Sequence, residues 1–308
     1  MYYTIQNKKL QIDSDQGMNW YNKKTFTCKN LTNIIYVNIC KQNNVLQELI
    51  LTNNKIEKLE NLDNLLNLRE LNLAANQITK IEGINDLMNL QTCDLSDNLI
   101  IKIENLDKLI NLRNLNLSNN EIFKFENMHL IRYQTILSFC ESISNVYEIE
   151  VFNNKITKIE GINTLINLQT LTIYNNQITK IEGLDNLIHL QYLDLSNNKI
   201  TKIEGLDTLI NLQTLKLSEN EITQINGIEN LINLQHLDIS NNQITQINGI
   251  DNLVNLKNLE LHCNKINKIE FLNNLINLQC LSLVNNQITK INGLDNLMNL
   301  EELYLSDN

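Results

Sequence analysis

The chain has 308 residues, of which 43% are hydrophobic and 5% aromatic, and its formal net charge at pH 7 is −10. Binding to nucleic-acid phosphates requires clustered Lys and Arg, so this charge argues against a nucleic-acid partner. No apolar run approaches the roughly 18 residues of a membrane-spanning helix, and the first residues lack the apolar run of a signal peptide. The composition favours an acidic, soluble protein that binds other proteins and no membrane.

Residues 1–44 do not follow the 22-residue pattern that fills the rest of the chain. Leu10 and Ile12 alternate with polar neighbours, as do Val37 and Ile39, which predicts short strands. The first coil of a stacked repeat otherwise exposes apolar side chains. We therefore expect residues 1–44 to form an N-terminal cap.

Residues 45–308 repeat one pattern, Leu-x-x-Leu-x-Leu-x-x-Asn-x-Ile, which is that of a leucine-rich repeat. Two of its apolar positions, such as Leu171 and Ile173, alternate with polar residues, which predicts a short strand with one buried face. The predicted fold class is α/β: a right-handed leucine-rich-repeat solenoid with a parallel β-sheet on the concave face and short 3₁₀ or α turns on the convex face. The fixed Asn, here called the ladder asparagine, stands at twelve positions: Asn54, Asn76, Asn98, Asn120, Asn154, Asn176, Asn198, Asn220, Asn242, Asn264, Asn286 and Asn308.

Two polar columns of the repeat have structural interpretations. A buried ladder asparagine is tolerable only if its amide bonds to backbone groups of neighbouring coils. Seven of the eight Gly stand seven residues after a ladder asparagine, where Asn61, Asn105 and Asn127 stand in other coils. Gly and Asn accept a positive φ angle most readily, so this turn is expected to be left-handed in every coil. Phe271 occupies the same column and is expected to be strained or locally remodelled.

One interval between ladder asparagines is 34 residues long instead of 22. Leu130, Tyr133, Leu137 and Cys140 follow helical spacing within the extra residues. The spacing predicts an inserted α-helix near 129–142 on the convex side. We interpret it as a degenerate repeat that still packs, with a docking element as the alternative.

The six Cys and four His form no set with the spacing of a metal site. Cys93 takes a core position of the repeat and is expected to be a buried thiol. Cys263 and Cys280 are five residues out of register in neighbouring coils, too far apart for a disulfide. Reduced thiols indicate a cytoplasmic or nuclear protein. No phosphate loop or nucleophile motif is present either, so we expect no enzyme activity and no cofactor.

The complete repeat reads L-x-x-L-x-L-x-x-N-x-I-T-K-I-E-G-L at residues 190–206 and, with one Leu replaced by Ile, at 168–184. It resembles the repeat of the leucine-rich regulatory subunit of protein phosphatase 1, over about residues 45–308. The resemblance implies a non-enzymatic regulator that binds the protein phosphatase 1 catalytic subunit through acidic and aromatic residues of its concave face. Dynein-associated repeat proteins share the subclass, so a cytoskeletal or ciliary adaptor is the alternative. Bacterial internalins share the repeat length but usually place Pro where this chain has Gly.

A shorter signal is the tetrapeptide Lys268-Ile-Glu-Phe271, which resembles the basic-[Val/Ile]-x-Phe docking motif of many phosphatase regulators. It falls on ordinary repeat columns, in a turn and not in a free extended segment. We therefore interpret it as part of the repeat.

The columns six, four and two residues before each ladder asparagine are expected to face outward from the concave sheet. Most of them carry small polar residues, but the middle coils carry aromatic, acidic and histidine side chains. Exposed aromatic residues among acids are typical anchors of protein interfaces. The predicted partner-binding residues are Tyr147, Glu148, Glu150, Phe152, Tyr174, Tyr192, Asp194, Lys216, His236, Asp238, Glu260 and His262.

Overall fold

The computed structural model describes residues 4–6, 9–12, 25–27, 36–39, 46–60, 62, 65–106, 108–123 and 146–308. The chain divides into two compact units, unit 1 (residues 1–155) and unit 2 (residues 156–308). The elements of the described residues are all β-strands. The helix predicted near 129–142 lies outside the described residues, as do Asn61 and Asn127 of the glycine column.

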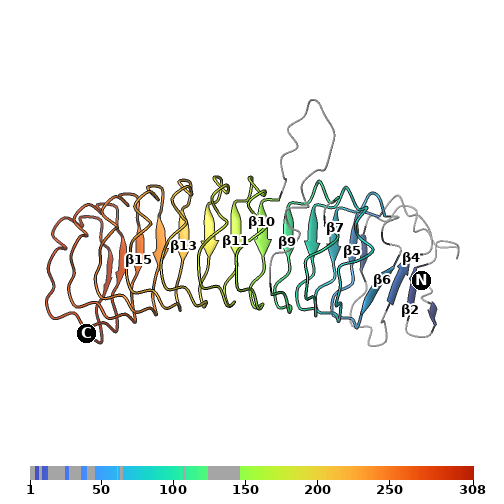
Figure 1. Cartoon of the computed structure of the whole chain (residues 1–308), viewed down its shortest axis with the longest axis horizontal. Helices are drawn as coiled ribbons and strands as arrows, with labels where there is room; N and C mark the ends of the chain where they lie inside the picture. The colour runs from blue at the N-terminus through green and yellow to red at the C-terminus, as the bar shows by residue number, and fades with distance from the viewer. Residues whose placement is uncertain are drawn as a thin grey trace, which may run out of the picture. The chain divides into compact units, whose positions relative to one another are not determined.

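Unit 1 contains a parallel sheet with the strand order β10-β9-β8-β7-β5-β3 (Figure 1). The repeat's core residues pair in register across it, so Leu49 stands opposite Leu71 and Leu71 opposite Cys93. A second sheet has the order β1-β2-β4-β6. The strands of unit 1 are β1 (Thr4–Gln6), β2 (Lys9–Ile12), β3 (Thr25–Thr27), β4 (Tyr36–Ile39), β5 (Glu48–Ile50), β6 (Lys58–Glu60), β7 (Glu70–Asn72), β8 (Thr92–Asp94), β9 (Asn114–Asn116) and β10 (Glu148–Glu150).

The predicted strands around Leu10 and Val37 are confirmed as β2 and β4, which pair in parallel. The repeat sheet also includes β3, because Phe26 stands opposite Leu49 in the next strand. Residues 25–27 of the segment assigned to the cap therefore continue the sheet of the repeat. The capping role of residues 1–44 stays a prediction.

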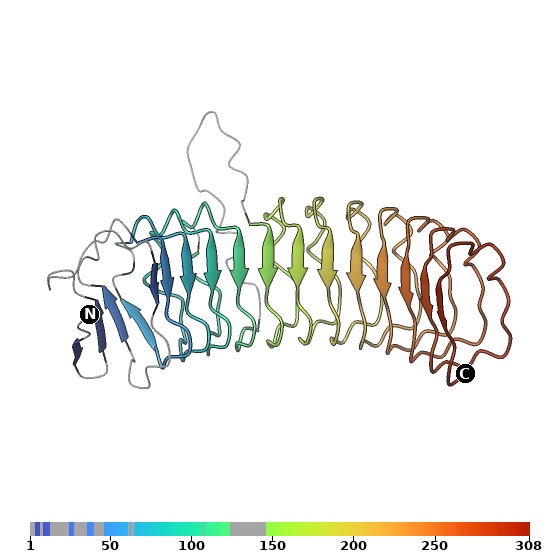
Figure 2. The same cartoon turned by 180° about the vertical axis from the view of Figure 1, so that it is seen from behind.

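Unit 2 contains one parallel sheet, in which seven strands follow one another in chain order (Figure 2). Each strand pairs with the residues that stand 22 positions further along, as Leu193 does with Leu215. The strands are β11 (Thr170–Thr172), β12 (Tyr192–Asp194), β13 (Thr214–Lys216), β14 (His236–Asp238), β15 (Asn258–Glu260), β16 (Cys280–Ser282) and β17 (Glu302–Tyr304).

The core of each unit is made of the same apolar columns in successive coils. In β13, Leu215 is fully buried while Thr214 and Lys216 on either side are half-buried, as the alternation of the repeat predicts. On the side opposite the sheet, the N–H of Leu187 donates to the Leu184 carbonyl oxygen, and that of Leu190 donates to Leu187. Both bonds span three residues, so these segments are hydrogen-bonded turns, and residues 184–190 contain neither the 3₁₀ nor the α turn that was expected.

The ladder asparagines bond the backbone as predicted. The Asn220 side chain is 8% exposed, and its Nδ2 donates to the carbonyl oxygens of Leu195 at 3.0 Å and Leu217 at 3.1 Å. Its Oδ1 accepts from the N–H of Ile200 at 3.0 Å. The buried amide is satisfied by the two coils it joins, so this column is structural.

The glycine column is left-handed, as expected: Gly227 has a φ of 79° and Asn105 a φ of 59°. Phe271 has a φ of 64°, so the backbone keeps the left-handed turn and is strained there, because Phe has a Cβ. A second left-handed column, missed in the sequence, stands directly before the ladder asparagines. It includes Glu219 and Cys263, with φ angles of 55° and 56°.

Candidate protein-binding faces

Each unit presents the outward side of its parallel sheet as a flat polar face. The face consists of the first and third residues of each strand and of the residue two positions before the ladder asparagine. Four of the twelve predicted binding residues lie in unit 1 and eight in unit 2. The unit 1 face is defined by Asp94, Glu148, Glu150 and Phe152, and the unit 2 face by Tyr174, Tyr192, Asp194, Lys216, His236, Asp238, Glu260 and His262.

Lys216 stands at the centre of the unit 2 face. It lies opposite Asp194 on one neighbouring strand and opposite Asp238 on the other. Its ammonium is 5.5 Å from the centre of the Tyr192 ring, within the range of a cation–π contact. The Tyr192 hydroxyl, followed by the charges of Asp194 and Asp238, raises the pKa of Lys216. The lysine therefore stays protonated, with carboxylates in register on both neighbouring strands.

Two of the aspartates also hold the backbone. Asp194 Oδ1 accepts from the N–H of Ser196 at 3.0 Å, and Asp238 Oδ1 accepts from the N–H of Ser240 at 3.0 Å. Asp194 is 7% exposed, and the Tyr192 hydroxyl donates to its Oδ2 at 3.4 Å. These carboxylates are fixed in place before any partner arrives, which lowers the entropy cost of binding.

The remaining members of the unit 2 face lie in the coils on either side. Glu260 Oε2 is 3.5 Å from His262 Nδ1, and each side chain is about one-third exposed, at 34% and 35%. Tyr174 is half-buried and His236 exposed. The face thus combines three carboxylates, one ammonium, two imidazoles and two phenol rings.

The unit 1 face is acidic. Glu148 and Glu150 project from β10, and Asn116 lies between Glu150 and Asp94 in register. Asn114 donates a hydrogen bond to Glu148 Oε2. Burial, followed by the charges of Glu148 and Asp94, raises the pKa of Glu150. These groups line a depression of about 370 Å³.

None of the described positions on the sheet face of unit 1 carries Lys or Arg. The described acids of this face are Glu48, Glu70, Asp94, Glu148 and Glu150. A surface with carboxylates and no cation attracts basic groups of a partner. Phe152 adds a half-buried aromatic ring beside them.

Tyr147 lies one position before the outward columns of the unit 1 face, and its role in binding stays a prediction. It precedes β10, and its N–H donates to the Arg113 carbonyl oxygen at 2.8 Å. The residue is one position too early for the outward columns, so its side chain leaves the backbone beside the sheet. Tyr147 is 37% exposed there.

The described residues contain no group of three His, Cys, Asp or Glu arranged to hold a metal ion. In that same part of the chain, no helix has the length and apolar character needed to cross a bilayer. Cys93, Cys263 and Cys280 are free thiols, and Cys93 is buried as predicted. Burial, with a smaller effect of Asp94, raises the Cys93 pKa to about 12.

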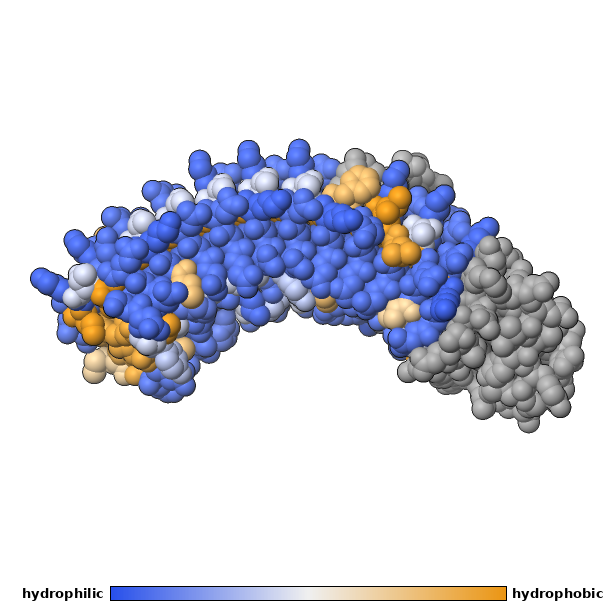
Figure 3. Space-filling view, turned by 90° about the horizontal axis from the view of Figure 1, so that it is seen from below, coloured by the Kyte–Doolittle hydropathy of each residue, from blue (hydrophilic) through white to orange (hydrophobic). Residues whose placement is uncertain are grey.

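Apolar surface gathers at the last coil of unit 2 (Figure 3). Ile291 is 61% exposed and Leu303 39% exposed, whereas Ile269 and Leu281, their counterparts one coil earlier, are 2% and 0% exposed. This patch consists of interior columns of the repeat and lies apart from the polar sheet face. We assign no partner to it.

The fold and its two faces define a solenoid repeat protein with a parallel sheet. A family model described as "Leucine Rich repeats (2 copies)" matches residues 44–86, 148–186, 188–230, 232–274 and 276–308, well over half of the chain. The chain belongs to the leucine-rich-repeat family. No curated protein sequence matches it significantly.

Solved structures of the same family agree with this assignment. An internalin, inlF from Listeria monocytogenes, is 32% identical with a TM-score of 0.64, and the match covers 84% of this chain and 80% of the internalin. The leucine-rich-repeat protein LIC12759 of Leptospira interrogans is 27% identical with a TM-score of 0.69, covering 83% and 71% of the two chains. The plant peptide hormone receptor RGFR1, solved in complex with RGF2, is 22% identical with a TM-score of 0.60, covering 96% and 58%. At that identity the likeness concerns the fold alone.

Proposed function

We propose that this chain is a non-enzymatic scaffold that binds a globular protein through the outward faces of its sheets. Membership of the leucine-rich-repeat family supports a protein-binding role. The repeat's resemblance to the regulatory subunit of protein phosphatase 1 supports the catalytic subunit of that phosphatase as the partner. The chain then acts as a regulator that holds the phosphatase.

The observation that carries this proposal is the arrangement around Lys216. Its flanking carboxylates, Asp194 and Asp238, are already bonded to the backbone, and Tyr192 offers an aromatic ring beside them. Preorganised charges and a rigid aromatic side chain are the features of interface residues that contribute most to affinity. Elsewhere the sheet face carries mostly small polar residues, so this cluster is the part best suited to recognition.

The charges on the two faces define the complementary surface. On the unit 2 face, Asp194, Asp238 and Glu260 outnumber Lys216. On the described part of the unit 1 face, every charged side chain is acidic. A partner surface with Lys and Arg side chains complements both faces.

The tetrapeptide Lys268-Ile-Glu-Phe271 does not provide a second docking mode. Ile269 is 2% exposed and fills the core of its coil, so the segment does not present an extended strand to a partner. Phe271 is 49% exposed but is held in a left-handed turn. The contact is therefore assigned to the sheet faces.

A charge-neutralised variant tests the proposal. In Asp194→Asn, Asp238→Asn, Glu260→Gln, the Asn side chains keep the bond to the backbone N–H, as Asn72 and Asn116 already do in unit 1. We expect the affinity for the purified phosphatase catalytic subunit to fall on the order of tenfold or more, because several charge pairs with the partner are lost.

The matched control is Glu182→Gln, Glu204→Gln, Glu270→Gln, which removes the same charge from exposed positions outside the sheet face. It should bind the phosphatase within about twofold of the natural chain, since exposed charges contribute little. Equal losses in both variants would show that net charge alone matters and that the unit 2 face is not the contact surface. If the natural chain captures no phosphatase catalytic subunit, that partner is wrong.

A further inference from the structure

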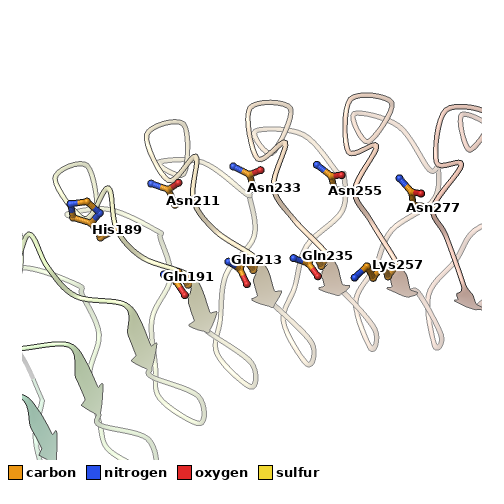
Figure 4. A pocket seen from close by; sticks show the side chains of 9 residues that line it. All are labelled: His189, Gln191, Asn211, Gln213, Asn233, Gln235, Asn255, Lys257 and Asn277. Atoms are coloured by element: carbon orange, nitrogen blue, oxygen red, sulfur yellow. The ribbon is translucent and has the colours of Figure 1, made fainter.

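Unit 2 contains a polar groove of about 860 Å³ that lies beside the sheet face (Figure 4). One wall carries Gln191, Gln213 and Gln235, each directly before a strand, and the other carries asparagines from the coil turns. The binding proposed above uses none of these side chains. Figure 4 shows the two rows running side by side, with His189 at one end of the asparagine row and Lys257 at the other end of the glutamine row.

The asparagine wall is held rigidly. Asn211 Nδ2 donates to the Ile188 carbonyl oxygen at 2.7 Å, and Asn233 Nδ2 donates to that of Ile210 at 2.8 Å. Asn255 repeats this bond to the coil before it at 2.8 Å. Each bond uses one N–H and fixes the amide plane. The side-chain oxygens of these asparagines accept no hydrogen bond among the described residues, so they are available to a ligand.

The glutamine wall carries more unused hydrogen-bonding groups. Gln191 and Gln213 are exposed and Gln235 is half-buried. Within the described part of the chain, their side-chain amides form no hydrogen bond. Each primary amide offers two donors and an acceptor. The groove therefore presents a regular series of neutral donors and acceptors.

An aliphatic ridge accompanies the asparagine wall. Ile210, Ile232 and Val254 each directly precede an asparagine of the wall, and they are 50%, 51% and 42% exposed. Half-exposed aliphatic side chains in an unbroken row are unusual on a soluble surface. None of the three lines the groove, so a ligand between the two rows meets mainly polar side chains.

The charge of the groove and the spacing of its side chains along the coils indicate the class of ligand. Its charged members are Lys257, near one end, and at most His189, at the other, so the amide rows between them suit a neutral chain. Asn stands in one row in four successive coils and Gln in the other row in three, and neighbouring coils are about 4.8 Å apart as in any parallel sheet. An extended peptide presents equivalent groups to one side only every second residue, about 6.7 Å apart, and falls out of step. In a β-1,4-linked chain of pyranose rings, one ring spans about the distance between neighbouring coils. Successive rings are turned over, but every ring presents hydroxyls at both of its edges.

We propose that the groove of unit 2 binds a neutral linear glycan, with about one ring per coil. Ring hydroxyls on both edges bond to the glutamine and asparagine amides. No aromatic ring lines the groove, so each ring contributes modestly and binding is cumulative. Affinity should rise with chain length until the ligand covers the groove from His189 to Asn277 and should then level off.

Calorimetric titration with β-1,4-linked glucose oligomers and β-1,4-linked N-acetylglucosamine oligomers of two to eight rings tests this proposal. The two series share the ring period and distinguish a hydroxyl from an acetamide at each ring. In Gln213→Ala, Gln235→Ala we expect affinity for the longest oligomer to fall on the order of tenfold, because several neutral hydrogen bonds are lost. The control is Gln169→Ala, Gln279→Ala, which changes exposed glutamines of the same column outside the groove.

The proposal is supported if one series shows the rise and plateau with length and only the groove variant weakens it. It is overturned if neither series binds, if affinity is independent of length, or if both variants lose affinity equally. Tighter binding of a neutral extended peptide, tested as a separate arm, would also overturn it. The sheet-face variant leaves the groove intact. A lack of glycan binding and a lack of phosphatase binding are therefore separate results.

Discussion

The backbone N–H of Ile200 donates to Oδ1 of Asn220, which stands one coil further along the chain, at 3.0 Å. The same side chain donates to the carbonyl oxygen of Leu195 in the earlier coil and to that of Leu217 in its own. A single amide thus satisfies buried backbone groups of two coils, and this contact recurs through both units.

Replacing Asn220 by Leu should lower the free energy of unfolding by about 3 kcal/mol or more. The change leaves a buried N–H and buried carbonyl oxygens without partners, and each such group costs roughly 1–3 kcal/mol. Urea denaturation measures the loss, and hydrogen exchange at the Ile200 amide locates it. Asn211→Ala, which removes one exposed hydrogen bond, is the control and should cost about 1 kcal/mol. Equal losses of unfolding free energy in the two variants would mean that a ladder asparagine stabilises the fold no more than an exposed asparagine does.

Gly227→Ala should destabilise unit 2 more than Gly293→Ala does. Both glycines are left-handed, with φ angles of 79° and 71°. A Cβ at Gly227 would lie 2.3 Å from the Ile203 carbonyl oxygen, whereas one at Gly293 would lie 3.2 Å from that of Ile269. The pair separates the close contact from the cost of the left-handed conformation, which is about 1–2 kcal/mol. Equal melting temperatures for the two variants would contradict the prediction.

Phe271→Gly should raise the stability of the chain by about 1 kcal/mol, since a side chain in a left-handed turn costs roughly 1–2 kcal/mol and the added backbone entropy offsets part of the gain. Phe271 is 49% exposed, so little buried area is lost. Thermal unfolding measures the gain. Phe271→Ala removes the ring and keeps the strain, and it should leave stability nearly unchanged. A gain as large in the Ala variant would place the strain in the ring rather than in the backbone.

Cys93 makes stability fall in alkali. Its folded pKa of about 12 lies above the ordinary value of 9.0, so its contribution is complete below pH 9 and is lost as the pH rises from 9 towards 12. The free energy of unfolding should fall by about 1.4 kcal/mol per pH unit in that window from this thiol alone. Comparing the natural chain with Cys93→Val between pH 8.5 and 10.5 isolates the effect, because other groups titrate equally in both. Parallel plots of unfolding free energy against pH for the two proteins would contradict this prediction.

Glu150→Gln should stabilise unit 1 at neutral pH. The folded pKa of Glu150 is raised by burial, then by Glu148 and Asp94, so its contribution is favourable below its ordinary pKa and is lost as the pH rises through the folded value. The variant should therefore be more stable than the natural chain at pH 7 and no more stable at pH 4. Glu70→Gln, on the same sheet face, is the control. A gain that persists in acid would rule out charge repulsion as its cause.

The repeated columns made most of the fold predictable. The 22-residue spacing of Leu171, Leu193 and Leu215 determines both the buried face of each strand and its register, because neighbouring coils offer identical partners. The turn at Gly227 was predictable for the same reason, since only Gly and Asn recur there. The strand β3 was missed because Phe26 lies in a segment without the repeat's other residues.

The sites were harder to predict from one sequence. The left-handed turn before the ladder asparagine did have a signal that was missed, because nine of the twelve residues in that column are Asn or Asp and only Ala75, Glu219 and Cys263 depart from it. Asp194 and Asp238 were recognised as face residues, but their bonds to Ser196 and Ser240 gave no signal beyond a common Asp-x-Ser spacing. The groove was missed although its two walls come from positions only two residues apart, as in Asn211 and Gln213, because only the stacking of coils aligns these side chains into two rows.

Because neighbouring coils pair in the same register, the repeat region can become longer or shorter by whole coils. Deleting residues 199–220 would place Glu221 directly after Asn198, and every column of the shortened chain would stay continuous. In-frame duplication of one such segment lengthens the molecule without any new packing problem. Descendants of this gene can therefore become longer or shorter by whole coils through single recombination events, while a deletion that is not a whole number of repeats shifts all later columns out of step.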